Sequence, residues 1–333
     1  MAYITLNKKH FFNNLDIIAN KTKSKDKIAI VLKDNAYGHG IVEIATMAKE
    51  YGITKAVVRC TPEAKMIEAF FEYVLVLADI PQVADKKIRY TINDKQSIKN
   101  YPKGSLVELK VDSGMHRNGV AFDELEEVLD LIKQQGLELE AIFTHHRSAD
   151  ELTSEWYWQN ENFKKVKQKV KELGYDNLRF HSANSASTLR HDSIEEDMVR
   201  VGIAVYGCMD EYLCDTKSLK PVLSLWAEKN STRRLKKGQR IGYGSTYELK
   251  EDAQVSNYDF GYGDGFFRVC SNNFVTPNGE KLLGRISMDN ASFLSTSQSL
   301  LIFNNASEIA KASKSISYEV LTSLKPYLKR RVV

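Results

Sequence analysis

A lysine stands where an apolar run ends and a polar, glycine-containing turn begins. The stretch VLKDNAYGHG, residues 31–40, follows the apolar segment KIAIV and precedes IVEIATMAKEYG, whose apolar residues recur at helical spacing. Lys33 therefore lies at a predicted strand-to-helix junction, which is where α/β barrels place their catalytic groups. Two interpretations are open for this amine: a lysine that forms a Schiff base with a carbonyl compound, or a solvated charge at a strand end. Position alone favours the solvated charge.

The elements around Lys33 form a repeated pattern in which short apolar runs alternate with amphipathic segments. We predict eight strands, at residues 27–33, 55–60, 73–78, 87–92, 105–112, 139–145, 177–182 and 198–200. The clearest predicted helices are 122–136, which ends on a C-cap-type glycine, and 154–174, which opens on a serine cap and also ends on glycine. Eight βα units predict a (β/α)8 barrel, with a short or missing helix after 73–78.

The pattern changes from about residue 218, where glycine turns separate strand-like segments and no helical period returns until about Ala306. The turn PNGE is typical of a hairpin between two strands. We therefore predict two domains: a barrel over residues 1–216 and a mostly β domain over residues 217–333.

Composition excludes several classes of protein. With 43% hydrophobic and 27% charged residues, the chain is an ordinary globular protein, and its net charge of +4 predicts no nucleic-acid partner. The basic tail KPYLKRR is expected to be a solvated terminus. No segment resembles a signal peptide or approaches the roughly 20 apolar residues of a membrane span. The cysteines lack paired spacing, which predicts reduced thiols in a cytoplasmic protein; they are Cys60, Cys208, Cys214 and Cys270.

Three familiar kinds of site find little support. The glycines of GYGDGF follow G-x-G-x-G, not G-x-G-x-x-G, and no βαβ unit follows them, which argues against a dinucleotide-binding fold. His145 and His146 are adjacent on a predicted strand, so they point to opposite faces, and no third ligand suits a metal. A Ser-His-Asp triad lacks a G-x-S-x-G nucleophile elbow.

The motifs taken together resemble one family. VLKDNAYGHG resembles the pyridoxal-phosphate lysine motif of the alanine racemases, which are fold type III enzymes. Further motifs of that family follow in the same order: LKVDSGMHRNG, FTHHRSADE, FHSANSA and MVRVGIAVYG in the barrel, and GYGSTY, GYGDG and GRISMD in the second domain. The resemblance spans essentially the whole chain. It implies an isomerase that interconverts L- and D-alanine and supplies D-alanine for peptidoglycan.

The resemblance also implies two bases on opposite faces of the bound substrate. Lys33 would hold the cofactor covalently and serve one face. Tyr243, contributed by the partner subunit of a homodimer, would serve the other, with His145 as its hydrogen-bonding neighbour. A phenol with an ordinary pKa near 10 is a poor base at neutral pH, so such a site must favour its ionised form.

The remaining residues implied by the resemblance hold the cofactor. Arg200 would face the pyridine nitrogen and, because arginine does not give up its proton, would leave that nitrogen unprotonated. His181 would orient Arg200 from behind. The cofactor phosphate would be held by a group of hydroxyl and backbone N–H donors: Tyr37, Ser185, Gly202 and Ile203, with Asn184 beside them.

Substrate contacts follow from the resemblance as well. Arg117 would contact the cofactor phenolate and the substrate carboxylate, and Lys110, seven residues earlier, would be carbamylated to pair with it. Met288 and Asp289 from the partner chain would complete the carboxylate pocket, and Tyr262 would line the entrance.

The chain departs from the family pattern at several points. His146-Arg147 replace the phenylalanine usual after the strand-six histidine, Val201 follows Arg200, and the late phosphate-binding tyrosine has no clear match, although Tyr327 lies one position away. The segment EAKMIEAFFEYV is shorter than usual. Alternatives are a broader amino-acid racemase acting on serine, a decarboxylase of the same fold, and a non-catalytic pyridoxal-phosphate carrier. The second domain, with Tyr243 and Met288, argues against the carrier.

Overall fold

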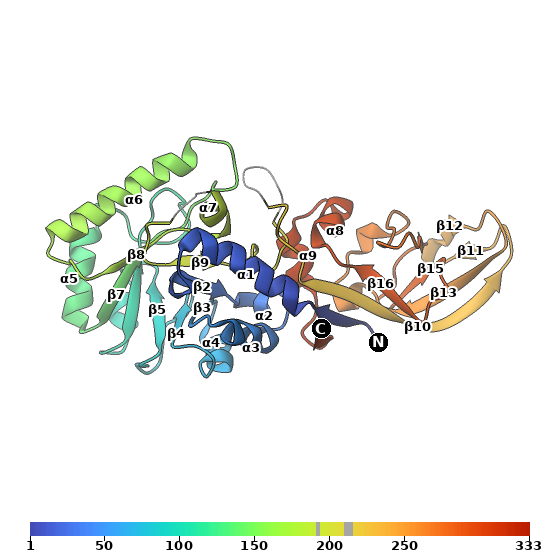
Figure 1. Cartoon of the computed structure of the whole chain (residues 1–333), viewed down its shortest axis with the longest axis horizontal. Helices are drawn as coiled ribbons and strands as arrows, with labels where there is room; N and C mark the ends of the chain where they lie inside the picture. The colour runs from blue at the N-terminus through green and yellow to red at the C-terminus, as the bar shows by residue number, and fades with distance from the viewer. Residues whose placement is uncertain (191–193, 210–215) are drawn as a thin grey trace.

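The computed structural model describes residues 1–190, 194–209 and 216–333, so Cys214 lies outside the described residues. Two bodies lie end to end (Figure 1): a strand barrel wrapped by helices and an elongated domain built mostly of strands. Both chain termini lie between them. No helix of the described residues is long and apolar enough to cross a membrane.

Eight parallel strands form the barrel, in the order β8-β7-β6-β5-β4-β3-β2-β9. Their bounds are β2 Ile28–Val31, β3 Lys55–Val58, β4 Tyr73–Val76, β5 Ile88–Ile92, β6 Leu106–Lys110, β7 Glu138–Phe143, β8 Arg179–His181 and β9 Val199–Val201. The seam between β8 and β9 is bridged by single backbone bonds, including Arg200 N–H to Ala183 O at 2.9 Å. The predicted (β/α)8 barrel is confirmed, with all eight strands close to their expected positions.

The barrel region contains seven helices in the described ranges: α1 Lys8–Thr22, α2 Lys33–Tyr37, α3 Ile41–Tyr51, α4 Thr61–Ile67, α5 Leu125–Gln135, α6 Glu155–Glu172 and α7 Ser185–Arg190. Residues 77–87, between β4 and β5, form no helix, as the short interval predicted. Ser154 is the N-cap of α6, as predicted, but makes no side-chain cap bond; the C-cap is Leu173, and Gly174 follows it with a φ of 85°. By contrast, Gly136 caps α5 in the left-handed region, where glycine carries no Cβ penalty.

The second domain is organised on a long strand, β10 (Leu223–Leu235), which pairs with β1, β13 and β16. The other elements are β1 Tyr3–Leu6, β11 Arg240–Ile241, β12 Tyr247–Glu248, β13 Ala253–Asp259, β14 Leu282–Leu283, β15 Asn290–Phe293, β16 Ser299–Phe303, β17 Lys329–Val332, α8 Ala306–Ser313 and α9 Ser317–Ser323. Short 3-10 turns are η1 Lys25–Lys27, η2 Ile98–Asn100, η3 Tyr243–Ser245, η4 Tyr262–Asp264 and η5 Arg268–Cys270.

Strand β1 belongs to this second sheet, although it lies within residues 1–216, the range predicted for the barrel domain. It pairs antiparallel with β10 and parallel with β17. Its burial alternates along the strand, with Ile4 and Leu6 inward, whereas β2 is buried at every position. Alternation is expected of a strand in a sheet with one buried face, and continuous burial of a barrel strand.

The two domains share one apolar core. A single connected set of buried side chains runs from Leu15 of α1 and Ile30 of β2 to Leu225 of β10 and Phe303 of β16. Fully burying a side chain of this kind contributes about 1.5–3 kcal/mol. The second domain is therefore packed onto the barrel through a continuous apolar core.

Candidate active site

Lys33 is the first residue of α2, and Leu32 alone separates it from the end of β2. The four residues after it, Asp34 to Tyr37, have φ values of 54, 55, 52 and 49°. This is the left-handed region, which costs an L-residue roughly 1–2 kcal/mol each, so the turn needs support from outside. Part of it comes from Asn35, whose side chain accepts the N–H of Ile41 at 2.9 Å.

The Lys33 amine lies in an environment that favours its neutral form. Burial lowers the pKa of Lys33, the Asp34 carboxylate opposes this, and the charges of Arg117 and Arg59 lower it further. A lysine with a depressed pKa is a better nucleophile toward a carbonyl group. The structure therefore favours the reactive lysine over the solvated strand-end charge.

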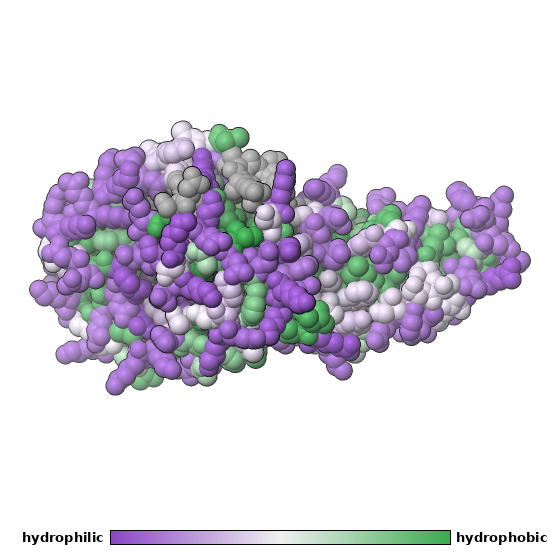
Figure 2. Space-filling view, in the orientation of Figure 1, coloured by the Kyte–Doolittle hydropathy of each residue, from purple (hydrophilic) through white to green (hydrophobic). Residues whose placement is uncertain are grey.

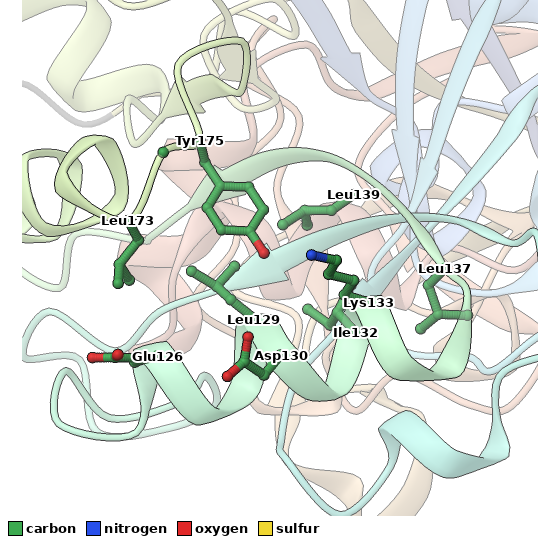
Figure 3. Close-up of a pocket in the computed structure, with 10 residues that line it drawn as sticks. Glu126, Leu129, Asp130, Ile132, Lys133, Leu137, Leu139, Leu173 and Tyr175 are labelled. Atoms are coloured by element: carbon green, nitrogen blue, oxygen red, sulfur yellow. The ribbon is translucent and has the colours of Figure 1, made fainter.

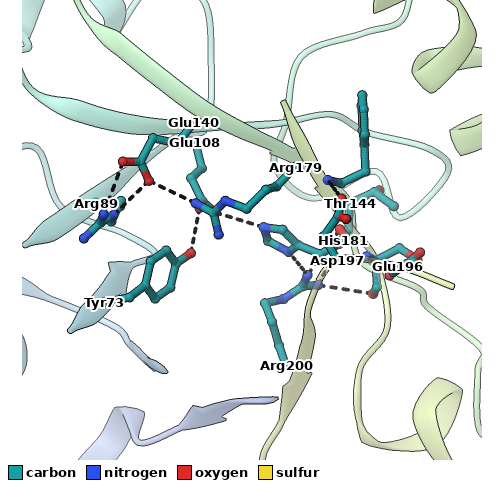
Figure 4. Close-up of polar contacts among 12 residues, drawn as sticks. Tyr73, Arg89, Glu108, Glu140, Thr144, Arg179, His181, Glu196, Asp197 and Arg200 are labelled. Carbon is teal, nitrogen blue, oxygen red and sulfur yellow. Dashed lines mark hydrogen bonds and ion pairs between the residues drawn. The ribbon is translucent and has the colours of Figure 1, made fainter. Parts of the chain in front are cut away.

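A buried chain of hydrogen bonds leads from Arg200 into the barrel (Figure 4). Arg200 contacts His181 Nδ1, and it donates to the carbonyl oxygens of Thr144 at 2.7 Å and Ser182 at 3.2 Å. On the other side of the ring, His181 Nε2 lies 2.9 Å from Glu108 Oε2. Because arginine only donates, His181 Nδ1 accepts and Nε2 carries the proton given to Glu108. The pairing of His181 with Arg200 that the resemblance implied is thus present.

Glu108 was not predicted, yet it is fully buried in β6. Its carboxylate also accepts bonds from Tyr73 at 2.6 Å and Arg179 at 3.0 Å. Burial alone would raise the pKa of Glu108, but His181, Arg179 and Tyr73 outweigh it and hold that pKa at about 2. In His181, burial prevails over Glu108 and lowers the pKa of the ring. The pair is therefore a carboxylate and a neutral imidazole.

Four basic side chains and a histidine gather beside these hydrogen-bonded residues and form what we call the cation cluster. Lys110, the last residue of β6, is buried, and burial together with the charges of Arg117 and Arg200 lowers its pKa to about 8. Burial and the charges of Arg200, Arg117 and Lys110 also hold the pKa of His145 well below its usual value. Lys33 contributes to the lowered pKa of Lys110. These mutual effects place the five predicted residues in one cluster.

The neighbouring His146 faces elsewhere, as expected for adjacent residues of an extended segment. Its Nδ1 lies 3.0 Å from Ser187 Oγ, and its ring lies 5.8 Å from that of Trp156. In the described ranges, no group of three His, Cys, Asp or Glu side chains is arranged to hold a metal ion.

An anion cradle lies beside Lys33. Ser185 Oγ accepts the N–H groups of Gly202 at 3.0 Å and Ala204 at 3.3 Å. The Tyr37 hydroxyl closes the other side, since a Cβ added at Gly202 would lie only 2.8 Å from it. Two hydroxyls and a turn of backbone N–H groups, which also includes the buried Ile203, suit a phosphate group. Asn184 borders the cradle and caps α7 by accepting the N–H of Ser187 at 2.9 Å.

The late tyrosine that the sequence did not match has a candidate in the structure. Tyr318, in α9, packs its ring 5.7 Å from that of Tyr37. Tyr327 points away instead, and its hydroxyl donates to Gly263 O at 2.9 Å. The only sequence signal for Tyr318 was a tyrosine in the first turn of the last predicted helical segment, which is too common to single it out.

The residues predicted from the second domain lie outside this cluster in the same chain. Tyr243 is 64% exposed and occupies η3, between β11 and β12. These two strands lie at the end of the molecule far from the barrel (Figure 1). Met288 is 56% exposed and Tyr262 39% exposed. Their segments are joined, because Gly263 N–H donates to Met288 O at 2.8 Å, and Asp289 follows directly. In one chain, these second-domain residues are therefore exposed, whereas the barrel residues are mostly buried.

Two hollows lie elsewhere on the barrel. One, of about 510 Å³, lies between α5 and the end of α6 (Figure 3) and is lined by leucines with Glu126, Asp130 and Lys133. The other, of about 580 Å³, includes Lys55 and Glu140 in its lining. Neither includes Lys33 or the anion cradle.

A parallel barrel that sets a lysine of lowered pKa beside a cradle of hydroxyl and backbone N–H groups, with a β domain attached, is typical of a lysine-centred (β/α)8-barrel enzyme. Residues 6–210 match the family model described as alanine racemase, N-terminal domain, and residues 222–332 match alanine racemase, C-terminal domain. The chain belongs to the alanine racemase family, isomerases that interconvert L- and D-alanine.

Sequence relatives and solved structures support the same family membership. The chain is 44% identical over 335 residues to an alanine racemase of Nitratiruptor sp., covering 99% of both chains, and 40% identical to that of Campylobacter curvus, covering all of both. Among solved structures, it superposes on an alanine racemase of Clostridium difficile with a TM-score of 0.91 at 27% identity, covering 100% of this chain and 95% of that one. An alanine racemase of Bacillus anthracis with bound L-Ala-P gives a TM-score of 0.89 at 28% identity, with the same coverage.

Proposed function

We propose that this chain binds pyridoxal 5'-phosphate through Lys33 and racemises alanine in sites shared between the two subunits of a homodimer, supplying D-alanine for peptidoglycan. The observation that supports it most directly is the Lys33 amine of lowered pKa beside an anion cradle of Tyr37, Ser185 and Gly202. When bound, the cofactor would acidify the α-proton of an amino acid that is joined to it.

The chain's own residues would hold the cofactor at its two ends. The phosphate would lie against Tyr37, Ser185 and the N–H groups at Gly202 and Ile203, with Tyr318 taking the part of the missing late tyrosine. At the other end, Arg200 would donate to the pyridine nitrogen. Its guanidinium is held by His181 and two carbonyl groups and cannot take up the opposite role of acceptor.

Two side chains would then move the α-proton. Lys33 would take it from one face of the substrate, and Tyr243 of the partner subunit would deliver one to the other face. His145, kept neutral by burial and the surrounding cations, would offer Tyr243 a hydrogen bond without adding a charge. Arg117 and the partner's backbone at Met288 and Asp289 would hold the substrate carboxylate, and Tyr262 would border the entrance.

The surface of the second domain supports a partner at this position. White and green residues interrupt its hydrophilic surface (Figure 2), and the exposed large side chains there include Tyr243, Tyr262, Val269, Met288 and Ile316. Aromatic and methionine side chains are enriched at protein interfaces. Because strands β11 and β12, which flank Tyr243, lie far from the barrel of their own chain, a second copy is the natural source of the opposite base.

Lys110 would be carbamylated in this site. Its pKa of about 8 leaves a substantial fraction of neutral amine at physiological pH, and a neutral amine adds carbon dioxide and releases a proton to give a carbamate. The anion would replace a cation that repels Arg117 and Arg200 with a group that attracts them.

Labelling with 13C-bicarbonate tests the carbamate. We expect an enriched carbamate carbon in the NMR spectrum of the wild type and none in Lys110→Gln. Lys55→Gln is the matched control, since the pKa of Lys55 is also lowered by burial but Lys55 lies elsewhere, in the lining of the second hollow, and it should keep the signal. A spectrum of the wild type without that carbon would contradict the proposal.

The function itself is tested by product and by label. Purified protein is incubated separately with L-alanine and L-serine, and the D-isomers are measured by chiral chromatography; a predominance of D-serine would indicate the broader racemase. Borohydride reduction of the holoenzyme should fix the cofactor on Lys33, located by peptide mass spectrometry. Label on another lysine, or no D-amino acid, would refute the proposal.

A further inference from the structure

The left-handed turn that follows Lys33 ends in three successive carbonyl groups, and each has a donor. His39 Nδ1 lies 3.1 Å from Ala36 O and 3.0 Å from Tyr37 O. The third, Gly38 O, accepts two bonds from Arg330, from Nε at 3.2 Å and from Nη2 at 2.8 Å. Arg330 is 292 positions away in the sequence, so this bond joins the lysine turn to the last strand of the chain.

Arg330 is itself held rigidly. Its remaining N–H groups donate to the carbonyl oxygens of Pro326 at 2.9 Å, Leu328 at 2.5 Å and Lys325 at 3.3 Å. Its backbone is fixed because β17 pairs with β1, with Arg330 opposite Ile4. The expectation of a solvated basic tail was therefore wrong at this residue. A planar guanidinium suits several fixed acceptors at once, whereas an ammonium group does not.

The turn is also pressed against the C-terminal segment. A Cβ added at Gly38 would lie 1.9 Å from Leu321 O, and one added at Gly40 would lie 2.5 Å from Arg330 Cδ. Both glycines have positive φ, 74° and 101°. A turn made of four strained residues has a lower-energy alternative, so its shape depends on these outside contacts.

We infer that Arg330 is a positioning residue for the cofactor lysine. By binding the Gly38 carbonyl from the second sheet, it holds the turn in its left-handed form and so directs the Lys33 amine toward the space beside the Tyr37 and Ser185 hydroxyls. This inference rests on the proposed role of Lys33. A displacement of a reacting group by about 1 Å can cost roughly 100-fold in rate, so the effect of a relaxed turn is measurable.

The test compares Arg330→Met with Arg331→Met. Arg331 is the next residue of β17, and its guanidinium lies over the Tyr3 ring at 4.6 Å rather than on the turn. Each variant is stripped of cofactor and mixed with pyridoxal phosphate. The rate of covalent capture is followed by borohydride quenching and peptide mass spectrometry, and kcat and KM for alanine are measured on the reloaded enzymes.

We expect Arg330→Met to capture the cofactor at Lys33 at least about tenfold more slowly and to lose kcat roughly 10- to 100-fold with little change in KM. Arg331→Met should stay within about twofold of wild type, and Arg330→Lys should fall between them because its ammonium cannot satisfy all the carbonyls. Amide exchange over residues 34–40 should rise only in the Arg330 variants.

The results distinguish failure of the Arg330 inference from failure of the proposed function. Arg330→Met that captures and turns over like Arg331→Met would overturn the inference and leave the proposed function intact. Wild-type enzyme that captures the cofactor on another residue would overturn the proposed function first. If Arg330→Met does not fold, Arg330→Lys decides: wild-type capture by this variant, with wild-type amide exchange over residues 34–40, would count against the positioning role.

Discussion

The two parts of the proposed site differ in what surrounds them. The barrel residues lie in a cluster closed on several sides, in which Arg200, His181 and Glu108 are each 6% exposed or less. The second-domain residues Tyr243 and Met288 are more than half exposed in the same chain. A buried, fully bonded group needs nothing further to keep its geometry, whereas an exposed aromatic base has no defined neighbours until another surface covers it.

In the proposed function, the barrel part would orient the cofactor and a partner subunit would complete the second-domain part. Mixed dimers test most directly whether a partner completes the site. Lys33→Ala and Tyr243→Phe homodimers should each lose at least about 1,000-fold in racemisation, because each lacks one of the two bases. In a mixed dimer with shared sites, one site holds both defects and the other holds neither.

Random one-to-one exchange of the two variants should therefore restore about a quarter of wild-type activity, since half the dimers are mixed and each has one intact site of two. Racemisation is measured after subunit exchange, with mixed dimers counted by native mass spectrometry. If mixed dimers form and activity stays at the level of the parents, Tyr243 acts within its own chain.

A second prediction concerns the buried barrel residues that orient Arg200. All contacts of Arg200 described above are to neutral acceptors, and its counter-charges are the carboxylates of Glu196 and, through His181, Glu108. Glu108→Gln removes one of these charges and leaves fewer acceptors for Tyr73 and Arg179, which is costly for buried donors. We expect kcat/KM to fall roughly 10- to 100-fold, as for other residues that orient a directly acting group.

Glu140→Gln is the matched control for Glu108→Gln. Glu140 accepts a bond from the same Arg179 at 2.9 Å and another from Arg89, but it does not contact His181 (Figure 4). The kcat/KM of the Glu140→Gln enzyme should differ from that of the wild type by less than about threefold. Equal losses in the two variants would show that the ion network as a whole, rather than the link from Glu108 to His181, is what matters.

Much of the fold was predictable because periodicity reports burial. The eight barrel strands are short apolar runs, and each was placed within a few residues of its position. The membership of β1 was not predictable, since its partner β10 lies more than 200 positions away and pairing of that range leaves no local pattern.

The site was predictable only where a motif named it. Lys33, Arg200 and His181 were recognised from their sequence segments, and the structure places Lys33 in the cation cluster and His181 against Arg200. Glu108 was missed because a single glutamate in LVELK is usual on an exposed strand face, and only the arrangement of several barrel strands surrounds it with His181, Tyr73 and Arg179. Arg330 was missed because a basic terminus is usually solvated.

The last prediction concerns the effect of acid on stability, in which the two parts should differ. His39 is fully buried and stacks on Tyr206, and among the described residues its Nε2 has no hydrogen-bond partner. Burial lowers the pKa of His39 from 6.5 to about 4 although its Nδ1 donates to two carbonyls, so the ring is neutral near pH 7. The unfolded chain therefore binds more protons than the folded one between those values, and stability present above pH 6.5 is lost as pH falls toward 4.

This histidine should cost the protein roughly 3 kcal/mol of unfolding free energy between pH 7 and pH 4. The measurement is urea unfolding at both pH values and at fixed protein concentration, for wild type, His39→Gln and Tyr243→Phe. His39→Gln should lose about that much less than wild type on acidification, although His145 and His181, whose pKa values are also lowered, keep part of the acid sensitivity in both. Tyr243→Phe should follow the wild type, because its side chain belongs to the exposed part. If His39→Gln and wild type lose the same stability, His39 does not set the acid sensitivity of the lysine turn.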